Sequence, residues 1–125
     1  MSSRGLLLLV LAALLQVAGN LLLREGVVRA GGLSLTLSRF GSELLKLAQQ
    51  PLFDIGVILY GAASLVWFGI VSTERLNASY PLLVSLTFIL VTVGATVLFK
   101  EPMSWQKVGG LAILLVGILL VATAR

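Results

Sequence analysis

The sequence holds 125 residues, of which 58% are hydrophobic and only 11% charged, and its mean hydropathy is +1.08. A soluble core of this size does not need so much apolar surface, so the composition predicts an integral membrane protein. The net charge of +4 comes from Lys and Arg residues between apolar runs, where they set membrane topology, and we expect no nucleic-acid partner.

Two absences narrow the chemistry further. The chain has neither cysteine nor histidine, which excludes disulfides, thiol catalysis and an ordinary transition-metal site. We therefore expect no metal, no other cofactor and no enzymatic activity.

A first membrane helix is predicted over residues 5–23, an apolar run between Arg4 and Arg24 that Gln16 and Asn20 interrupt. A cleaved signal peptide is the competing interpretation of such a run. The run is long for the apolar part of a signal peptide, however, and no small-residue cleavage site follows it cleanly. We therefore expect a retained helix.

The stretch over residues 26–51 predicts an amphipathic helix over residues 36–49. Apolar side chains recur at helical spacing on one face and polar side chains on another. The apolar set is Leu37, Phe40, Leu44 and Leu47, and the polar set is Arg39, Glu43, Lys46 and Gln50. Such a helix lies along the membrane surface or packs as a connecting helix on the bundle, and the pattern leaves both open.

Three further apolar runs predict membrane helices over residues 52–72, 78–99 and 105–124. The predicted fold class is thus an all-α membrane protein with four transmembrane helices, an amphipathic helix in the first loop and one domain over residues 1–125. Short loops make it an up-down bundle with both termini on one side. Of the nine Lys and Arg residues, three lie on the side of the termini (Arg4, Arg75 and Arg125) and six on the other, which favours termini outside.

A polar stripe runs along the first predicted helix. Gln16, Asn20 and Arg24 are separated by fours and so share one face, with Gln16 about 12 Å inside Arg24. Amides are costly in hydrocarbon, so the stripe should face protein, water or a ligand. Simple hydrogen bonds to a neighbouring helix would also explain each amide alone. We favour a lined cavity for a stripe that ends in arginine.

Further candidates for a binding site lie on the second and third predicted helices. Tyr60, Ser64 and Trp67 follow spacings that place them on one side of the second helix, and Tyr80 and Thr87 share a face of the third. Tyrosine and tryptophan also serve as plain anchors at membrane interfaces, and that alternative stays open.

The fourth predicted helix carries a flat face formed by Gly110, Ile113 and Gly117. Another helix can approach such a face closely, either in the same subunit or across a dimer seam. Four helices are too few to enclose a path for a sizeable solute, so the dimer seam is the more economical interpretation.

No Asp, Glu, Lys, Arg or His lies at mid-depth in any predicted span, because Asp54, Glu74 and Glu101 all sit near span ends. Proton-coupled transport normally needs a buried titratable group. The sequence therefore argues against proton coupling.

The chain resembles the small multidrug resistance family of the EamA-like drug/metabolite transporter superfamily. The resemblance lies in the four-helix plan, residues 14–20 (LLQVAGN) followed by Arg24, the Ser-Tyr start of the third helix and the glycine face of the fourth. Residues 17–19 (VAG), 80–83 (YPLL) and 100–104 (KEPMS) look closer to the subunits that flip undecaprenyl-phosphate-linked aminoarabinose.

This resemblance implies an antiparallel dimer whose first three helices line a central chamber and whose fourth helix holds the dimer together. The family's drug exporters carry a glutamate in the first helix where this chain has Gln16, which argues against proton-coupled cation export. Tyr80 matches a tyrosine that lines the exporters' chamber. Leu83 replaces the tryptophan expected one turn later, which weakens an aromatic cage for cations.

We therefore expect a flippase-like transporter of the bacterial inner membrane that moves a polyprenyl-phosphate-linked sugar, or a similar amphiphile, between leaflets. Gln16 and Asn20 would bind the head group and Arg24 the phosphate. The expected partners are membrane lipid and a second copy or a related subunit. The alternatives are efflux of small hydrophobic or cationic compounds and a non-transporting subunit of a membrane complex.

Overall fold

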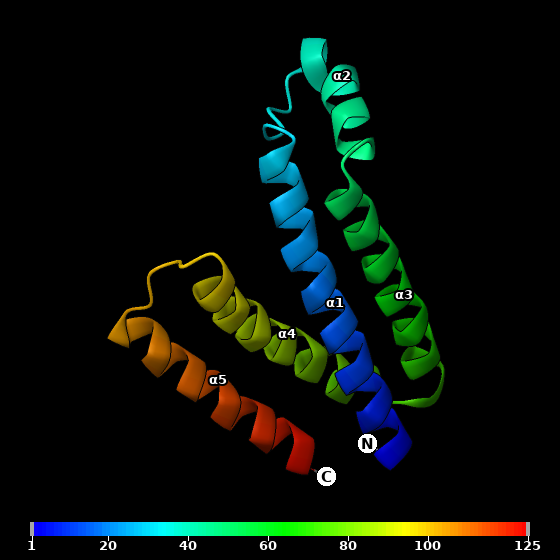
Figure 1. Cartoon of the computed structure of the whole chain (residues 1–125). Coiled ribbons are helices and arrows are strands. Elements are labelled where there is room, and N and C mark those ends of the chain that lie inside the picture. The colour runs from blue at the N-terminus through cyan, green and yellow to red at the C-terminus, as the bar shows by residue number, and fades with distance from the viewer. Residues whose placement is uncertain (1, 125) are drawn as a thin grey trace.

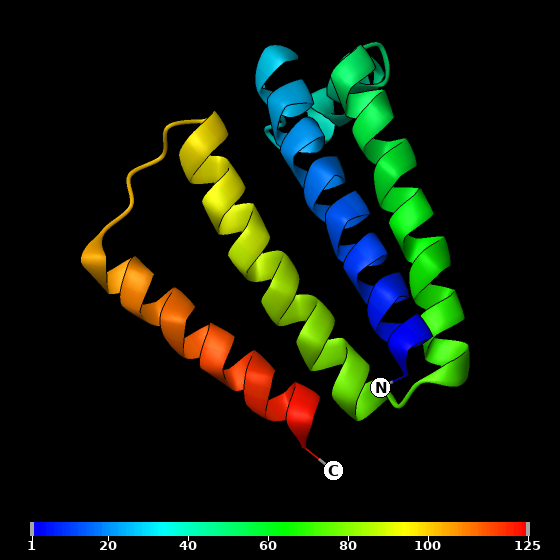
Figure 2. The same ribbon diagram turned by 60° about the horizontal axis from the view of Figure 1, so that its bottom comes forward.

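The computed structural model describes residues 2–124 as an all-α chain (Figure 1). Four of its helices are long and apolar enough to cross a membrane: α1 (Ser3–Arg29), α3 (Pro51–Thr73), α4 (Leu76–Leu98) and α5 (Trp105–Thr123). The short helix α2 (Leu37–Ala48) lies in the loop between α1 and α3. These elements confirm the predicted fold class of four spans with an additional loop helix. The end of the chain near Ser2 and the end near Ala124 lie on the same side (Figures 1 and 2).

Helix α1 extends well past residue 23, where the apolar run of the sequence ends. Its 27 residues measure about 40 Å at a rise of 1.5 Å each, longer than the roughly 30 Å hydrocarbon core. Arg24 and Gly26, expected beyond the helix, lie within it, and Glu25 forms an i,i+4 ion pair of 3.0 Å with Arg29 in the last turns. The charged residues therefore mark the membrane interface rather than the end of the helix.

The end of α1 is set by two glycines. Gly31 and Gly32 have φ values of 96° and 89°, which side chains with a Cβ rarely adopt. The Gly31 amide donates to the Val28 carbonyl at 3.1 Å, and the Gly32 amide donates to the Val27 carbonyl at 2.8 Å. This pair of bonds closes the helix as a Schellman motif.

Helices α1 and α3 pack along their length through small residues (Figures 1 and 2). Small residues recur every seven positions on the buried face of α1, at Gly5, Ala12, Gly19 and Gly26. The buried face of α3 repeats this spacing with the small residues Gly56 and Ala63, followed by the large Ile70. A Cβ added at Gly19 would lie 3.1 Å from the Gly56 carbonyl oxygen, and one at Gly26 would lie 2.6 Å from the Phe53 amide nitrogen. We call this contact the glycine seam. It brings the two backbones almost into direct contact.

Helix α4 completes the core at the end of the bundle where the termini lie. Its Leu82 and Leu83 are buried against Leu9 and Ala13 of α1 and Ile70 of α3. Farther along α4, Gly94 faces the side chain of Leu21, 3.0 Å from where a Cβ would be. The core is thus small and is built by three helices.

Helix α5 packs only along one side. It has no buried residue among the described positions, and Ile118 and Val121 near its C-terminal end are the ones that touch the core. Residues 99–104 form a loop without helix or strand, and α5 diverges from α4 toward this loop (Figure 2).

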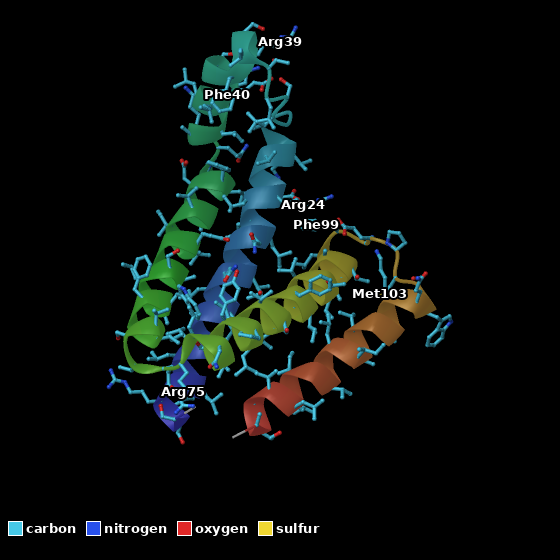
Figure 3. All side chains as sticks on the ribbon, turned by 180° about the vertical axis from the view of Figure 1, so that it is seen from behind. Arg24, Arg39, Phe40, Arg75, Phe99 and Met103 are labelled. Carbon is cyan, nitrogen blue, oxygen red and sulfur yellow. The ribbon has the colours of Figure 1, made fainter. Side chains whose placement is uncertain are left out.

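The loop before α2 is tied to that helix by a carboxylate. The Ser34 amide and hydroxyl donate to the two oxygens of Glu43 at 2.9 and 2.8 Å. Apart from buried Leu47, the apolar side of α2 is uncovered, since Leu37, Phe40 and Leu44 are exposed; Phe40 and Arg39 are labelled in Figure 3. This exposure favours the membrane-surface interpretation of α2 over packing on the bundle.

We expect Gly26→Ala to destabilise the bundle by about 1 to 3 kcal/mol, because its Cβ would overlap the Phe53 backbone. Gly61→Ala on α3 is the matched control, since a Cβ there meets open space. Denaturant unfolding of the detergent-solubilised protein, followed by circular dichroism, measures both. Equal stability of the two variants would contradict the glycine seam.

Hydrogen bonds from the Ser34 hydroxyl and then its amide lower the pKa of Glu43, with help from Arg39 and Lys46. Because the folded pKa is lowered, the carboxylate favours the ordered loop above the usual carboxyl pKa, and this contribution is lost as pH falls through the lowered value. We expect the Ser34 amide resonance to titrate with a midpoint below that of an ordinary glutamate. Glu43→Gln should abolish the transition, and a titration unchanged in that variant would contradict the contact.

Candidate functional site

An open-sided hollow of about 190 Å³ lies where α1, α3 and α4 meet. Its lining residues come from all three helices: Gln16 from α1, Tyr60, Ala63, Ser64 and Trp67 from α3, and Tyr80 and Leu83 from α4. Five of the eight residues predicted to bind substrate are thereby brought together. We call this space the polar hollow.

Gln16 is the polar group that α1 contributes to the polar hollow. It lies midway along α1, about 20 Å from either end of that helix. Its amide nitrogen donates to the Tyr60 hydroxyl at 3.5 Å, which is long for a hydrogen bond. An amide offers two donor hydrogens and an acceptor oxygen, so most of its hydrogen-bonding capacity is available to a ligand.

One wall of the polar hollow is aromatic. The rings of Trp67 and Tyr80 lie 5.9 Å apart between centroids and are inclined by 55°. A tilted pair of this kind contributes about 0.5 to 1.5 kcal/mol beyond its burial and ties α3 to α4. Tyr80 remains 55% exposed, so its hydroxyl is accessible. Leu83, which stands where the resemblance expects a tryptophan, is buried beside it.

Two predicted site hydroxyls are used within their own helices. Ser64 donates to the Tyr60 carbonyl at 3.1 Å, and Thr87 donates to the Leu83 carbonyl at 2.8 Å. Thr87 is buried and does not line the polar hollow. Such back-bonding removes the donor that a ligand would need, so Thr87 contributes to packing rather than to the hollow.

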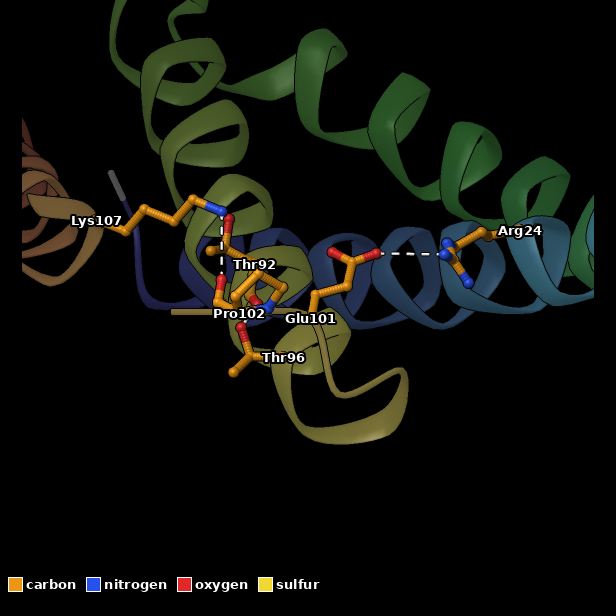
Figure 4. Close-up of polar contacts among 6 residues, drawn as sticks. All are labelled: Arg24, Thr92, Thr96, Glu101, Pro102 and Lys107. Atoms are coloured by element: carbon orange, nitrogen blue, oxygen red, sulfur yellow. Dashed lines mark hydrogen bonds and ion pairs between the residues drawn. The ribbon is translucent and has the colours of Figure 1, made fainter. Parts of the chain in front are cut away.

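The Arg24 side chain does not line the polar hollow. Its guanidinium lies 3.4 Å from the Glu101 carboxylate and 4.2 Å from the centroid of the Phe99 ring (Figures 3 and 4). Both partners of the ion pair are nearly half exposed, so the pair contributes about 1 kcal/mol at most. Asn20 is half-buried and does not line the hollow. Of the three residues in the polar stripe, Gln16 is thus the one that lines the polar hollow.

The lining of the polar hollow carries no carboxylate, ammonium or guanidinium. Its polar side-chain groups are one amide, two phenols, one indole N–H and one serine hydroxyl. Such a surface binds neutral hydroxyl and amide groups by hydrogen bonds, and its aromatic faces attract a cation without a counter-charge.

The α5 face formed by Gly110, Ile113 and Gly117 is not packed against another helix in the described part of the chain. A Cβ at Gly110 or Gly117 would meet nothing within 4 Å, and Ile113 is 74% exposed. Within residues 2–124 this face therefore makes no close helix contact, although Gly110 borders the space between α4 and α5. The face remains a predicted dimer seam.

Several residues that shape the site were not predicted from the sequence. Ala63 forms part of the lining, and Glu101 and Phe99 hold Arg24 away from it. The seven-residue spacing of small residues on α1 was the one signal for the glycine seam, which aligns Gln16 with Tyr60. No local pattern pointed to the Arg24 partners, because they lie in a distant loop.

Comparison with known proteins places the chain among bacterial membrane proteins. It is 36% identical over 121 residues to the probable 4-amino-4-deoxy-L-arabinose-phosphoundecaprenol flippase subunit ArnE of Serratia proteamaculans, covering 94% of this chain and 95% of that protein. It is 31% identical over 114 residues to the same subunit of Erwinia tasmaniensis, covering 91% and 93%. This chain belongs to the family of these flippase subunits.

The family contains two kinds of subunit, and the chain is similar to both. It is also 31% identical over 122 residues to the probable flippase subunit ArnF of Proteus mirabilis, covering 94% of this chain and 91% of that one. No family model matches the chain, and no solved structure matches it. Together with the four spans, these relatives identify a multi-pass transport protein of the bacterial inner membrane.

Proposed function

We propose that this flippase subunit moves an amino-sugar head group, linked to a polyprenyl phosphate, between leaflets through the polar hollow. The observation that carries the proposal is the position of Gln16. An amide with spare hydrogen-bonding capacity lies midway along a helix long enough to span the membrane, in an open space beside two phenols. A lipid would leave such a group unsatisfied, whereas sugar hydroxyls satisfy it.

The rest of the hollow supports an amino sugar as the cargo. The relatives are named for a 4-amino-4-deoxy-arabinose carried on phosphoundecaprenol. Its hydroxyls would bond Gln16 and Tyr60, and its amine would lie on the aromatic wall of Trp67 and Tyr80, where a cation is stabilised without a carboxylate. The guanidinium of Arg24, nearly half exposed at the interface, would meet the phosphate.

We further propose that a second subunit completes the site. The hollow of about 190 Å³ is smaller than the roughly 300 to 1,000 Å³ of complete small-molecule sites. The relatives are named as subunits, and this chain resembles both kinds. A related subunit in a heterodimer would supply the other wall, with the α5 face of Gly110, Ile113 and Gly117 as the seam. This arrangement agrees with the dimer, held together by the fourth helix, that resemblance to the small multidrug resistance family implies.

The proposal makes the protein a transporter and not an enzyme. Movement would follow the gradient set by synthesis of the lipid on one side and its use on the other, so no titratable group is required. Proton-coupled efflux of cations would need a carboxylate, and the lining of the hollow has none.

We expect Gln16→Leu to slow transport about tenfold, because one hydrogen bond to the head group is worth about 1 to 1.5 kcal/mol. Vesicles are prepared with the chain, its related subunit and the amino-sugar lipid, and a membrane-impermeant amine reagent measures the arrival of the amine outside. Gln106→Leu, which replaces an exposed amide on α5, is the control. Transport at the same rate in wild type and Gln16→Leu would refute the role of the hollow.

A further inference from the structure

A second cavity of about 450 Å³ lies between α4 and α5, separate from the polar hollow. Its walls are mostly apolar and include Phe88 and Val91 of α4 and Leu111 and Leu114 of α5. The cavity lies where α5 diverges from α4, and α5 has no buried residue among the described positions (Figure 2). In a membrane this cavity, which we call the lateral groove, therefore opens toward lipid.

The hydroxyl groups in the lateral groove do not make it polar. Thr92 donates to the Phe88 carbonyl at 2.8 Å. Thr96 donates to the Thr92 carbonyl, also at 2.8 Å (Figure 4). Their donor hydrogens are thus used within α4. The floor of the groove is accordingly suited to a hydrocarbon chain.

The mouth of the lateral groove is positive. The Lys107 ammonium donates to the Pro102 carbonyl at a long 3.4 Å, whereas Glu101, the carboxylate at the mouth, is paired with Arg24 (Figure 4). Among residues 2–124, no carboxylate lies within ion-pair distance of Lys107. Lys107 also sits in the first turn of α5, capped by Ser104, where the helix dipole adds partial positive charge.

We propose that the lateral groove holds the part of a polyprenyl chain nearest the phosphate of a lipid phosphate, with the phosphate on Lys107 and the rest of the chain in the bilayer. An apolar channel with one cation at its mouth complements an amphiphile with an anionic end. The inference rests on the proposed function, since it assigns the tail of the same lipid and adds Lys107 to Arg24, which pairs with Glu101 at the same mouth, as a partner of its phosphate. The groove and the polar hollow share no lining residue, so the two sites are tested independently.

A helix from a second copy is a poorer occupant of the lateral groove. One helical turn is about 10 to 12 Å across and 5.4 Å long, and so fills roughly 420 to 610 Å³, as much as the whole groove. A packed helix would also bury the Lys107 charge against apolar side chains at considerable cost. A phosphate neutralises this charge and keeps it near water.

The test is native mass spectrometry of the full chain titrated with undecaprenyl phosphate, which reads lipid affinity and oligomeric state together. Gly110→Leu would place a side chain in the groove, and a Cβ there meets no neighbour, so the fold tolerates it. We expect at least tenfold weaker binding for Gly110→Leu and about fivefold weaker binding for Lys107→Gln, with Lys107→Arg close to wild type. Gly109→Leu is the matched control, because its Cβ also meets open space but Gly109 does not line the groove.

Ala95→Leu blocks the lateral groove from α4, away from the predicted dimer seam, and should weaken binding in the same way. Unchanged affinity in Gly110→Leu, Ala95→Leu and Lys107→Gln, with wild type binding the lipid, would overturn the groove and leave the proposed function standing. Loss of lipid only together with loss of the dimer would assign the groove to a second copy and overturn the proposal. If phosphatidylglycerol binds as tightly and its binding also depends on the groove, the groove is a site for bulk membrane lipid and the proposal of a polyprenyl site is overturned. If wild type does not bind undecaprenyl phosphate, both proposals are refuted.

Discussion

The near contact of the α1 and α3 backbones determines how the other features of this protein are arranged. Lipid tails are as apolar as leucine side chains, so helices in a membrane gain little from hydrophobic burial and associate through close packing. Glycines at positions 19, 26 and 56 permit this approach, and a methyl group at any of them would meet neighbouring backbone. The seam fixes the rotation of both helices. It thereby sets Gln16 opposite Tyr60, with the amide facing the hollow instead of lipid.

Helix α4 joins two surfaces of different character. Near its N-terminal end, Tyr80 and Leu83 close the polar hollow; farther along, Phe88 and Val91 form one wall of the lateral groove. Helix α5 adds the other wall of this groove and keeps its outer face uncovered. The two surfaces differ because the helices pack differently. Small residues hold α1 and α3 in close contact, whereas α5 has no buried residue among the described positions and diverges from α4. In our proposals the polar hollow receives the head of an amphiphile, and the lateral groove with Lys107 at its mouth receives its anion and apolar tail.

The sequence predicted the spans well because an apolar run of bilayer length rarely forms anything but a membrane helix. Helical spacing also grouped Tyr60, Ser64 and Trp67, which the structure places together with Gln16. Spacing along one helix gives no information on partners from another. Arg24 has the spacing of the stripe, but Glu101 in the α4–α5 loop draws it aside. Thr87 shared a face with Tyr80, yet its hydroxyl is bonded to its own backbone.

If the polar hollow is the transport site, the middle of α1 faces a space that water and head groups enter. Because the chain has no cysteine, Gln16→Cys introduces a single thiol for a membrane-impermeant maleimide. Leu14→Cys is the matched control, since Leu14 is exposed on the outer surface of α1, where lipid would surround it. We predict labelling at position 16, slowed by the amino-sugar lipid, and little labelling at position 14. A position 16 thiol as unreactive as the one at position 14 would contradict this role of the hollow.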